Sequence, residues 1–68
     1  MARYYVNKNP QTNGDHEVHT ASCNRIPKVE NRIYLGDFSN CEKAVKKAKE
    51  HYKKSNGCFY CSRDCNTG

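Results

Sequence analysis

The chain contains no tryptophan, few large aliphatic side chains, and no apolar stretch long enough to cross a bilayer. Its start, from Met1 to Val6, lacks the apolar core of a secretory signal peptide. We therefore expect a cytoplasmic protein whose thiols stay reduced. With 68 residues, the chain can build only one thin hydrophobic core. Domains of this size usually need a disulfide, a metal or a partner subunit as well, so we predict one stapled domain over 1–68.

Five cysteines can supply that extra stabilisation. An odd number leaves one thiol unpaired in any scheme made only of disulfides, and a reducing compartment favours metal binding over cystine. Metal-binding side chains occur as two short pairs, His19-x-x-x-Cys23 and Cys58-x-x-Cys61. Such spacings let one loop supply two ligands, and structural zinc is held by four thiolate or imidazole ligands. We predict one zinc site with four ligands: His19, Cys23, Cys58 and Cys61.

Three other residues compete with this assignment. His16 is an alternative ligand, but a separation of three along a strand places it on the face opposite His19. Cys65 could replace His19, pair with Cys41 if oxidised, or stay free, and we expect a free thiol or an accessory role. Cys41 falls on the apolar face of a predicted helix, so we expect a buried core thiol there.

Patterns of apolar and turn-forming residues predict a small α+β fold with a zinc staple. Arg3–Val6 and Glu17–Thr20 have strand character, and the segment 9–15 between them is dense in turn formers, which predicts an N-terminal β-hairpin. Arg32–Leu35 predicts a third short strand, ended by Gly36. This sheet should pack on one long helix, and the Cys-x-x-Cys pair should form a C-terminal knuckle.

The long helix is expected to begin with a capping box made by Ser39 and Glu42. We expect it to run to about Lys54, where Asn56-Gly57 supplies the left-handed residue that commonly ends a helix. Apolar residues at helical spacing form one face that should pack on the sheet. They are Cys41, Ala44, Val45, Ala48 and Tyr52.

The opposite face of the predicted helix is rich in lysine. Its members are Lys43, Lys46, Lys47, Lys49, Lys53 and Lys54. Together with a net charge of +5, this face predicts weak, sequence-independent, salt-sensitive binding if it meets nucleic acid. The alternatives are a solvated helix surface, which we favour because charged residues belong there regardless of function, and a protein partner. Tyr4, Tyr5, Phe59 and Tyr60 could stack on bases, yet in so small a core we expect most of them to pack inside.

These residues together resemble the N-terminal metal-binding domain of the Ada alkylation-repair protein and related small zinc modules attached to bacterial nucleases. In that pattern, a ligand-x-x-x-Cys pair follows a strand, an Asn-hydrophobic-aromatic strand comes next, and a short helix with alanines leads through Gly to Cys-x-x-Cys. The stretch from His19 to Cys61, about two thirds of the chain, corresponds to it. The matching positions are Asn31-Arg32-Ile33-Tyr34, Ala44, Ala48, Gly57 and Cys58-x-x-Cys61.

Departures from the Ada pattern bear on function. His19 stands where Ada carries the cysteine that accepts a methyl group, and imidazole can hold zinc but does not replace an activated thiolate. The helix is expected to be longer than in the Ada pattern. Gly57 directly precedes Cys58, whereas in Ada the glycine stands a few residues before the knuckle, with a proline between. No catalytic set is visible, so we expect a structural zinc module and not an enzyme. The alternatives are a thiol-based enzyme (a methyl acceptor or redox protein) using Cys23, Cys58 or Cys61, and a metal-free domain held by disulfides.

Overall fold

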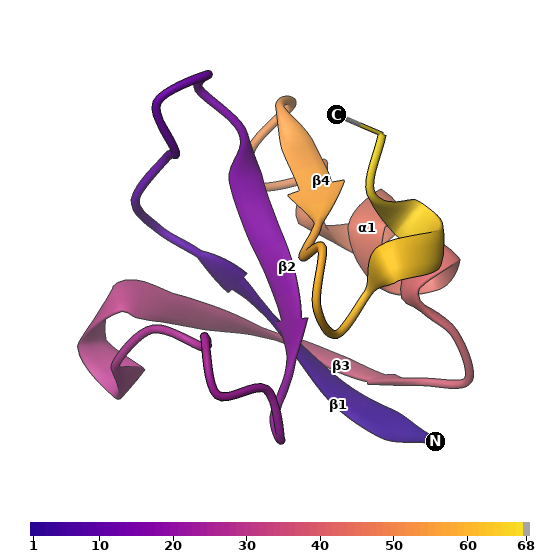
Figure 1. Ribbon diagram of the computed structural model, residues 1–68. Helices are drawn as coiled ribbons and strands as arrows, with labels where there is room; N and C mark the ends of the chain where they lie inside the picture. The colour runs from indigo at the N-terminus through magenta and orange to yellow at the C-terminus, as the bar shows by residue number, and fades with distance from the viewer. Residues whose placement is uncertain (68) are drawn as a thin grey trace.

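The computed structural model describes residues 1–67, which form a four-stranded sheet packed on one short helix (Figure 1). The elements in chain order are β1 (Ala2–Asn7), β2 (His16–Thr20), β3 (Arg32–Phe38), α1 (Cys41–Ala48) and β4 (Ser55–Gly57). Single 3₁₀ turns precede β3 and follow β4, at Val29–Asn31 and Arg63–Cys65. The predicted α+β class is confirmed. No helix within residues 1–67 has the length and apolar character needed to cross a membrane.

The sheet has the strand order β3-β1-β2-β4, one strand more than the three that the sequence predicted. β1 is antiparallel to both of its neighbours, with Tyr5 opposite His19 and Val6 opposite Val18. β4 pairs with β2 in parallel, and Val18 lies opposite Gly57. In Figure 1 the short orange β4 lies beside β2, although the chain passes through β3 and α1 between them. This parallel pairing brings the end of the chain to the end of β2.

A small apolar core lies between the sheet and α1. Its buried members are Tyr4, Val6, Val18, Leu35, Ala44 and Ala48. The two alanines are fully buried, and their small side chains let the helix backbone approach the strands closely. The predicted apolar helix face is therefore the face that packs, with Cys41, Val45 and Tyr52 partly buried against the same cluster. So few large side chains provide only a modest part of the stability that the fold needs.

The helix is shorter than predicted and begins with a different cap. Asn40, not Ser39, is the N-cap, and its side-chain oxygen accepts a hydrogen bond from the backbone N–H of Lys43 at 3.1 Å. The helix ends at Ala48 and not near Lys54. Beyond it the backbone tightens into turns that bond three residues back, from the Glu50 N–H to the Lys47 carbonyl at 3.1 Å and from the His51 N–H to the Ala48 carbonyl at 2.9 Å. The ring of Tyr52 then stacks on His16, at 3.7 Å between centroids. Tyr52 therefore contacts β2 beyond the end of the helix.

Two glycines have roles other than those predicted. Gly36 does not end β3; it has φ +132° opposite Tyr4, at a shift in the β1–β3 register, and the strand continues to Phe38. Gly57 lies inside β4 and lacks the positive φ of a helix-ending residue. A Cβ atom there would lie 2.6 Å from the carbonyl oxygen of Ser62 and 2.7 Å from the Cβ of Cys65. Gly57 is therefore needed for close approach of the C-terminal turn.

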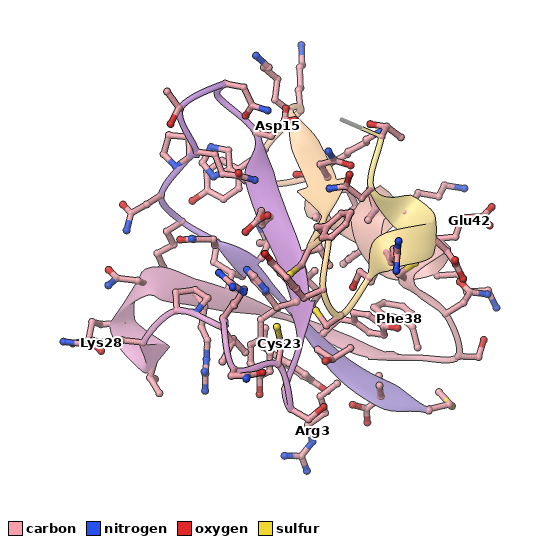
Figure 2. All side chains as sticks on the ribbon, in the orientation of Figure 1. Arg3, Asp15, Cys23, Lys28, Phe38 and Glu42 are labelled. Carbon is pink, nitrogen blue, oxygen red and sulfur yellow. A yellow bond between two sulfur atoms is a disulfide. The ribbon has the colours of Figure 1, made fainter. Side chains whose placement is uncertain are left out.

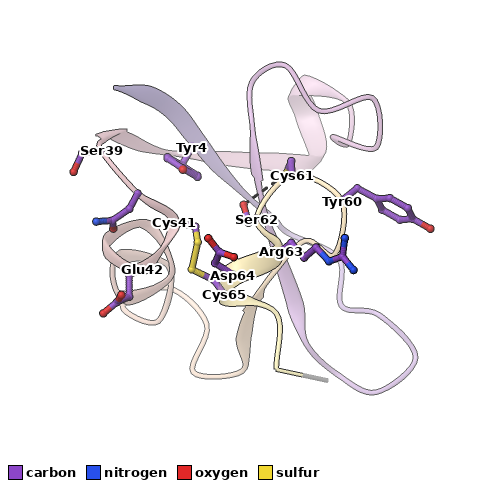
Figure 3. A pocket seen from close by; sticks show the side chains of 11 residues that line it. Tyr4, Ser39, Cys41, Glu42, Tyr60, Cys61, Ser62, Arg63, Asp64 and Cys65 are labelled. Atoms are coloured by element: carbon purple, nitrogen blue, oxygen red, sulfur yellow. Dashed lines mark hydrogen bonds between the residues drawn. A yellow bond between two sulfur atoms is a disulfide. The ribbon is translucent and has the colours of Figure 1, made fainter.

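Cys41 and Cys65 form a disulfide, which corrects two predictions (Figure 3). Cys65 was expected to be a free or accessory thiol and Cys41 a buried core thiol, in a chain whose thiols were all reduced. The bond joins the first residue of α1 to the last residue of the 3₁₀ turn Arg63–Cys65, across a Cα–Cα distance of 6.1 Å. The tail reaches the helix because β4 carries it back along β2, a long-range pairing that the sequence pattern does not reveal.

Candidate metal centre

Four metal-binding side chains from two separate parts of the chain come together at one end of the sheet. His19 lies in β2 and Cys23 in the turn that follows it, while Cys58 and Cys61 lie in the turn directly after β4. One ligand atom from each residue lies within 4.8 Å of every other, and this group could hold a metal ion. His19, Cys23 and Cys58 are buried, and Cys61 is half-buried. Figure 2 shows Cys23 beside the end of β2.

The parallel pairing of β2 with β4 explains how the two ligand pairs meet. Parallel strands end at the same edge of a sheet, so the turns that follow them leave side by side. Cys58 is fixed in this position by its backbone N–H, which donates to the Val18 carbonyl at 2.9 Å. The first turn is closed by the N–H of Cys23 bonding to the Thr20 carbonyl at 3.1 Å, and the second by the N–H of Ser62 bonding to the Cys58 carbonyl at 2.9 Å.

Backbone N–H groups point at two of the sulfur atoms. The N–H of Thr20 donates to Cys61 Sγ at 3.2 Å, and that of Tyr60 donates to Cys58 Sγ at 3.4 Å. Donors of this kind favour a thiolate over a thiol. Burial by itself raises the pKa of Cys61, but hydrogen bonds from Thr20, Ser62 and Cys23 outweigh it and leave that pKa below its ordinary value. The environment is therefore built to accept negative charge at Cys61.

The pKa of Cys23 shifts in the opposite direction to that of Cys61. Burial, together with the neighbouring Cys61 and Cys58, raises the pKa of its thiol to about 11, although a backbone hydrogen bond involving Arg25 works in the other direction. Three thiols packed together cannot all ionise without a compensating positive charge, because the like charges repel. A divalent cation among them supplies that charge and deprotonates coordinating thiols.

His19 is almost completely buried, with 1% of its surface exposed. Burial lowers its pKa and so favours the neutral imidazole, which is the form that binds metals. Its Nδ1 atom lies 4.0 Å from Cys61 Sγ, on the side of the sulfur atoms. Its Nε2 atom has no hydrogen-bond partner within residues 1–67, but lies 3.5 Å from Oε1 of Glu17. One ring nitrogen therefore faces the cluster and the other faces a carboxylate.

Sequence reasoning did not single out Glu17. Residues two apart on a strand share a face, so Glu17 lies on the same side of β2 as His19. An acidic residue two positions before a candidate ligand on a strand is the sequence signal that could have identified Glu17. Metal-bound histidines usually donate their second N–H to a carboxylate or a carbonyl.

The two alternative ligands lie outside the cluster. His16 stacks on Tyr52, and its Nδ1 lies 2.8 Å from the carbonyl oxygen of Asn7. Cys65 is joined to Cys41. The structure therefore brings together the four residues of the two short pairs. His16 and Cys65 do not join them.

No protein-family model, curated protein or solved structure matches this chain. The likeness to the Ada metal-binding domain consequently rests on the residue pattern alone. The case for a metal centre rests on the geometry of the four side chains.

Proposed function

We propose that the protein is a small zinc-binding module whose ion has a structural role. The observation that carries this proposal is the convergence of four ligand atoms within 4.8 Å of one another. Zinc–sulfur bonds of about 2.3 Å and zinc–nitrogen bonds of about 2.0 Å place tetrahedral ligand atoms roughly 3.5–3.8 Å apart. Cys23 Sγ and Cys58 Sγ are 3.9 Å apart, and Cys61 Sγ and His19 Nδ1 are 4.0 Å apart. These two pairs need only a slight contraction to bind zinc.

The chemistry of the ligands supports zinc among the common metal ions. Three thiolates and one imidazole suit zinc, whereas calcium and magnesium take oxygen ligands. Four protein ligands also fill a tetrahedral site, and a catalytic zinc needs an open position for water or substrate. The ion would therefore hold the turns after β2 and β4 together in a Cys-x-x-Cys knuckle. The Ada-like pattern supports the same module, and His19 argues against methyl transfer.

Native mass spectrometry tests the metal directly. We expect one zinc ion per chain in protein purified without chelators, and a thiolate-to-cobalt charge-transfer band after replacement by cobalt. His19→Ala should weaken binding strongly, because it removes a ligand. The matched variant His16→Ala, on the same strand, should retain the ion. A chain that is folded and free of metal would contradict the proposal.

Glu17 should strengthen metal binding by orienting the imidazole of His19. A carboxylate that accepts the second N–H of a metal-bound histidine fixes the ring and makes it a better ligand, and its loss typically costs about 10- to 100-fold in affinity. Glu17→Gln keeps the size of the side chain and removes its charge, so we expect a loss of this order in competition with a chromogenic chelator. Glu30→Gln, at an exposed position before β3, is the control. Equal zinc affinity in the two variants would exclude this role.

The partial exposure of Cys61 favours the alternative function, a thiol-based enzyme. It is half-buried where Cys23 and Cys58 are buried, and it lines a cavity of about 440 Å³ beside the disulfide (Figure 3). Timed alkylation of the native protein separates the two functions. Structural zinc thiolates should react slowly and together, and a catalytic thiolate should react first and alone.

A basic surface that binds nucleic acid or a protein partner is also part of the proposal. The six lysines of α1 and the segment after it are exposed. Two of them have partners within the chain, since Lys47 pairs with Glu50 at 3.1 Å and Lys54 donates to the Asn13 carbonyl at 2.9 Å. The net charge of +5 supports weak, salt-sensitive attraction to a polyanion.

A further inference from the structure

Phe59 and Tyr60, between the two cysteines of the second ligand pair, carry exposed aromatic rings. The exposed fraction is 48% for Phe59 and 63% for Tyr60, whereas Tyr4 is buried in the core as expected. Figure 3 shows Tyr60 pointing away from Cys61. The two rings meet edge to face, with centroids 5.3 Å apart. The expectation that most of the aromatic residues pack inside is wrong for this pair, and adjacent exposed aromatics mark an interaction surface.

Each of these rings has an arginine beside it. The guanidinium carbon of Arg25 lies 3.8 Å from the centroid of Tyr60, and that of Arg63 lies 5.1 Å from the centroid of Phe59. Arg25 belongs to the turn that carries Cys23, and Arg63 follows the turn that carries Cys61. A guanidinium that stacks on a ring directs its N–H groups outward in its own plane, where they match the geometry of a phosphate.

A polar cleft of about 360 Å³ adjoins the same side chains. Phe59, Tyr60 and Arg25 line it, together with the amide side chains of Gln11 and Asn13. Amides offer both donors and acceptors, which is what the edge of a nucleobase requires. Glu17 also lines the cleft, where its carboxylate interacts with Gln11 and Arg25, and its Oε1 lies 3.5 Å from His19 Nε2.

We propose that Phe59, Tyr60, Arg25 and Arg63, here called the aromatic edge, bind single-stranded nucleic acid. Unpaired bases stack on the rings, and the phosphates beside them pair with the arginines. Single strands fit better than a duplex, because the faces of paired bases are covered by their neighbours. The positive charge of the edge and of the whole chain complements a polyanion. The inference rests on the proposed zinc site, since the ion holds the turns that carry both rings and Arg25.

Fluorescence anisotropy with the zinc-loaded full chain tests the aromatic edge. The probes are short labelled oligouridine and oligothymidine strands and a duplex of equal length. We expect the single strands to bind more tightly than the duplex, and Tyr60→Ala to weaken binding by about 5- to 150-fold, the usual effect of losing one ring on which a base stacks. Tyr60→Phe should bind like the unmodified protein, because it keeps the ring. Tyr34→Ala, which removes a 53%-exposed tyrosine from the opposite edge of the sheet, should also have no effect.

The zinc content of each sample separates this inference from the proposed function. A protein without zinc contradicts the metal proposal, whatever the oligonucleotides do. If zinc is present and Tyr60→Ala binds as well as the unmodified chain, the aromatic edge is not the binding surface. A duplex that binds as tightly as the single strands would point to the lysines instead. No binding of any oligonucleotide at low salt would overturn the inference and leave a protein as the partner class.

Discussion

Removal of the bound metal should unfold the protein. Structural zinc contributes about 10–16 kcal/mol of apparent binding free energy in small metal-dependent domains, whereas a core in a chain this short supplies only about 3–5 kcal/mol. The core here has two valines, one leucine, one tyrosine and two alanines as its buried members. The proposed ion would therefore outweigh the apolar contribution, and the sheet should not persist without it.

Far-UV circular dichroism and amide NMR during titration with a strong chelator provide the measurement. We expect the dispersed amide signals to disappear once the chelator exceeds the zinc by one molar equivalent. They should return when zinc is added back. Cys58→Ser should give the same unfolded spectrum without chelator, because Cys58 is fully buried and follows β4 directly. Ser22→Ala, an exposed change beside Cys23, is the control that should fold normally. A chelated chain with an unchanged thermal midpoint would rule out metal-dependent folding.

Loss of the Cys41–Cys65 disulfide should lower the free energy of unfolding by about 3.5 kcal/mol, while zinc binding continues. The estimate comes from the loop-closure entropy of a cross-link between residues 24 apart in sequence. Neither cysteine belongs to the His19 cluster, so the metal ligands are untouched. A loss of this size is comparable to the whole expected contribution of the core.

The double variant Cys41→Ser/Cys65→Ser is the right test, because a single substitution leaves a free thiol near the metal ligands. Urea unfolding in the presence of excess zinc, followed by circular dichroism, gives the free energy, and mass spectrometry gives the zinc content. If the midpoint of the double variant equals that of the unmodified protein, the two cysteines do not stabilise the fold through a bond. If zinc is lost as well, the disulfide and the metal centre are not independent.

The features that sequence reasoning identified are local ones. The spacing within each ligand pair requires only one turn of chain, and the structure brings all four side chains together. The apolar face of the helix also follows from periodicity, and Ala44 and Ala48 are buried. Patterns within a few residues are set by backbone geometry, so they can be read without the fold.

The features that it missed depend on distant contacts. Ser55–Gly57 has little strand propensity, and it forms β4 only by pairing with β2. The same pairing brings Cys65 to Cys41, a bond that the sequence offered only as one of three alternatives for Cys65. The stacking of Tyr52 on His16, a contact between the segment after the helix and β2, is of the same long-range kind. The exposure of Phe59 and Tyr60 was misjudged because the sequence does not show an arginine beside each ring.

The disulfide and the four-residue cluster alternate along the chain. In order, the first ligand pair is followed by Cys41, then by the second ligand pair, and then by Cys65. The two closed loops therefore overlap, and neither is nested inside the other. With the metal in place, any single break in the backbone between Cys23 and Cys65 leaves both fragments joined. A protease that nicks the exposed lysine-rich segment after α1 would produce a two-chain molecule of unchanged mass apart from one added water.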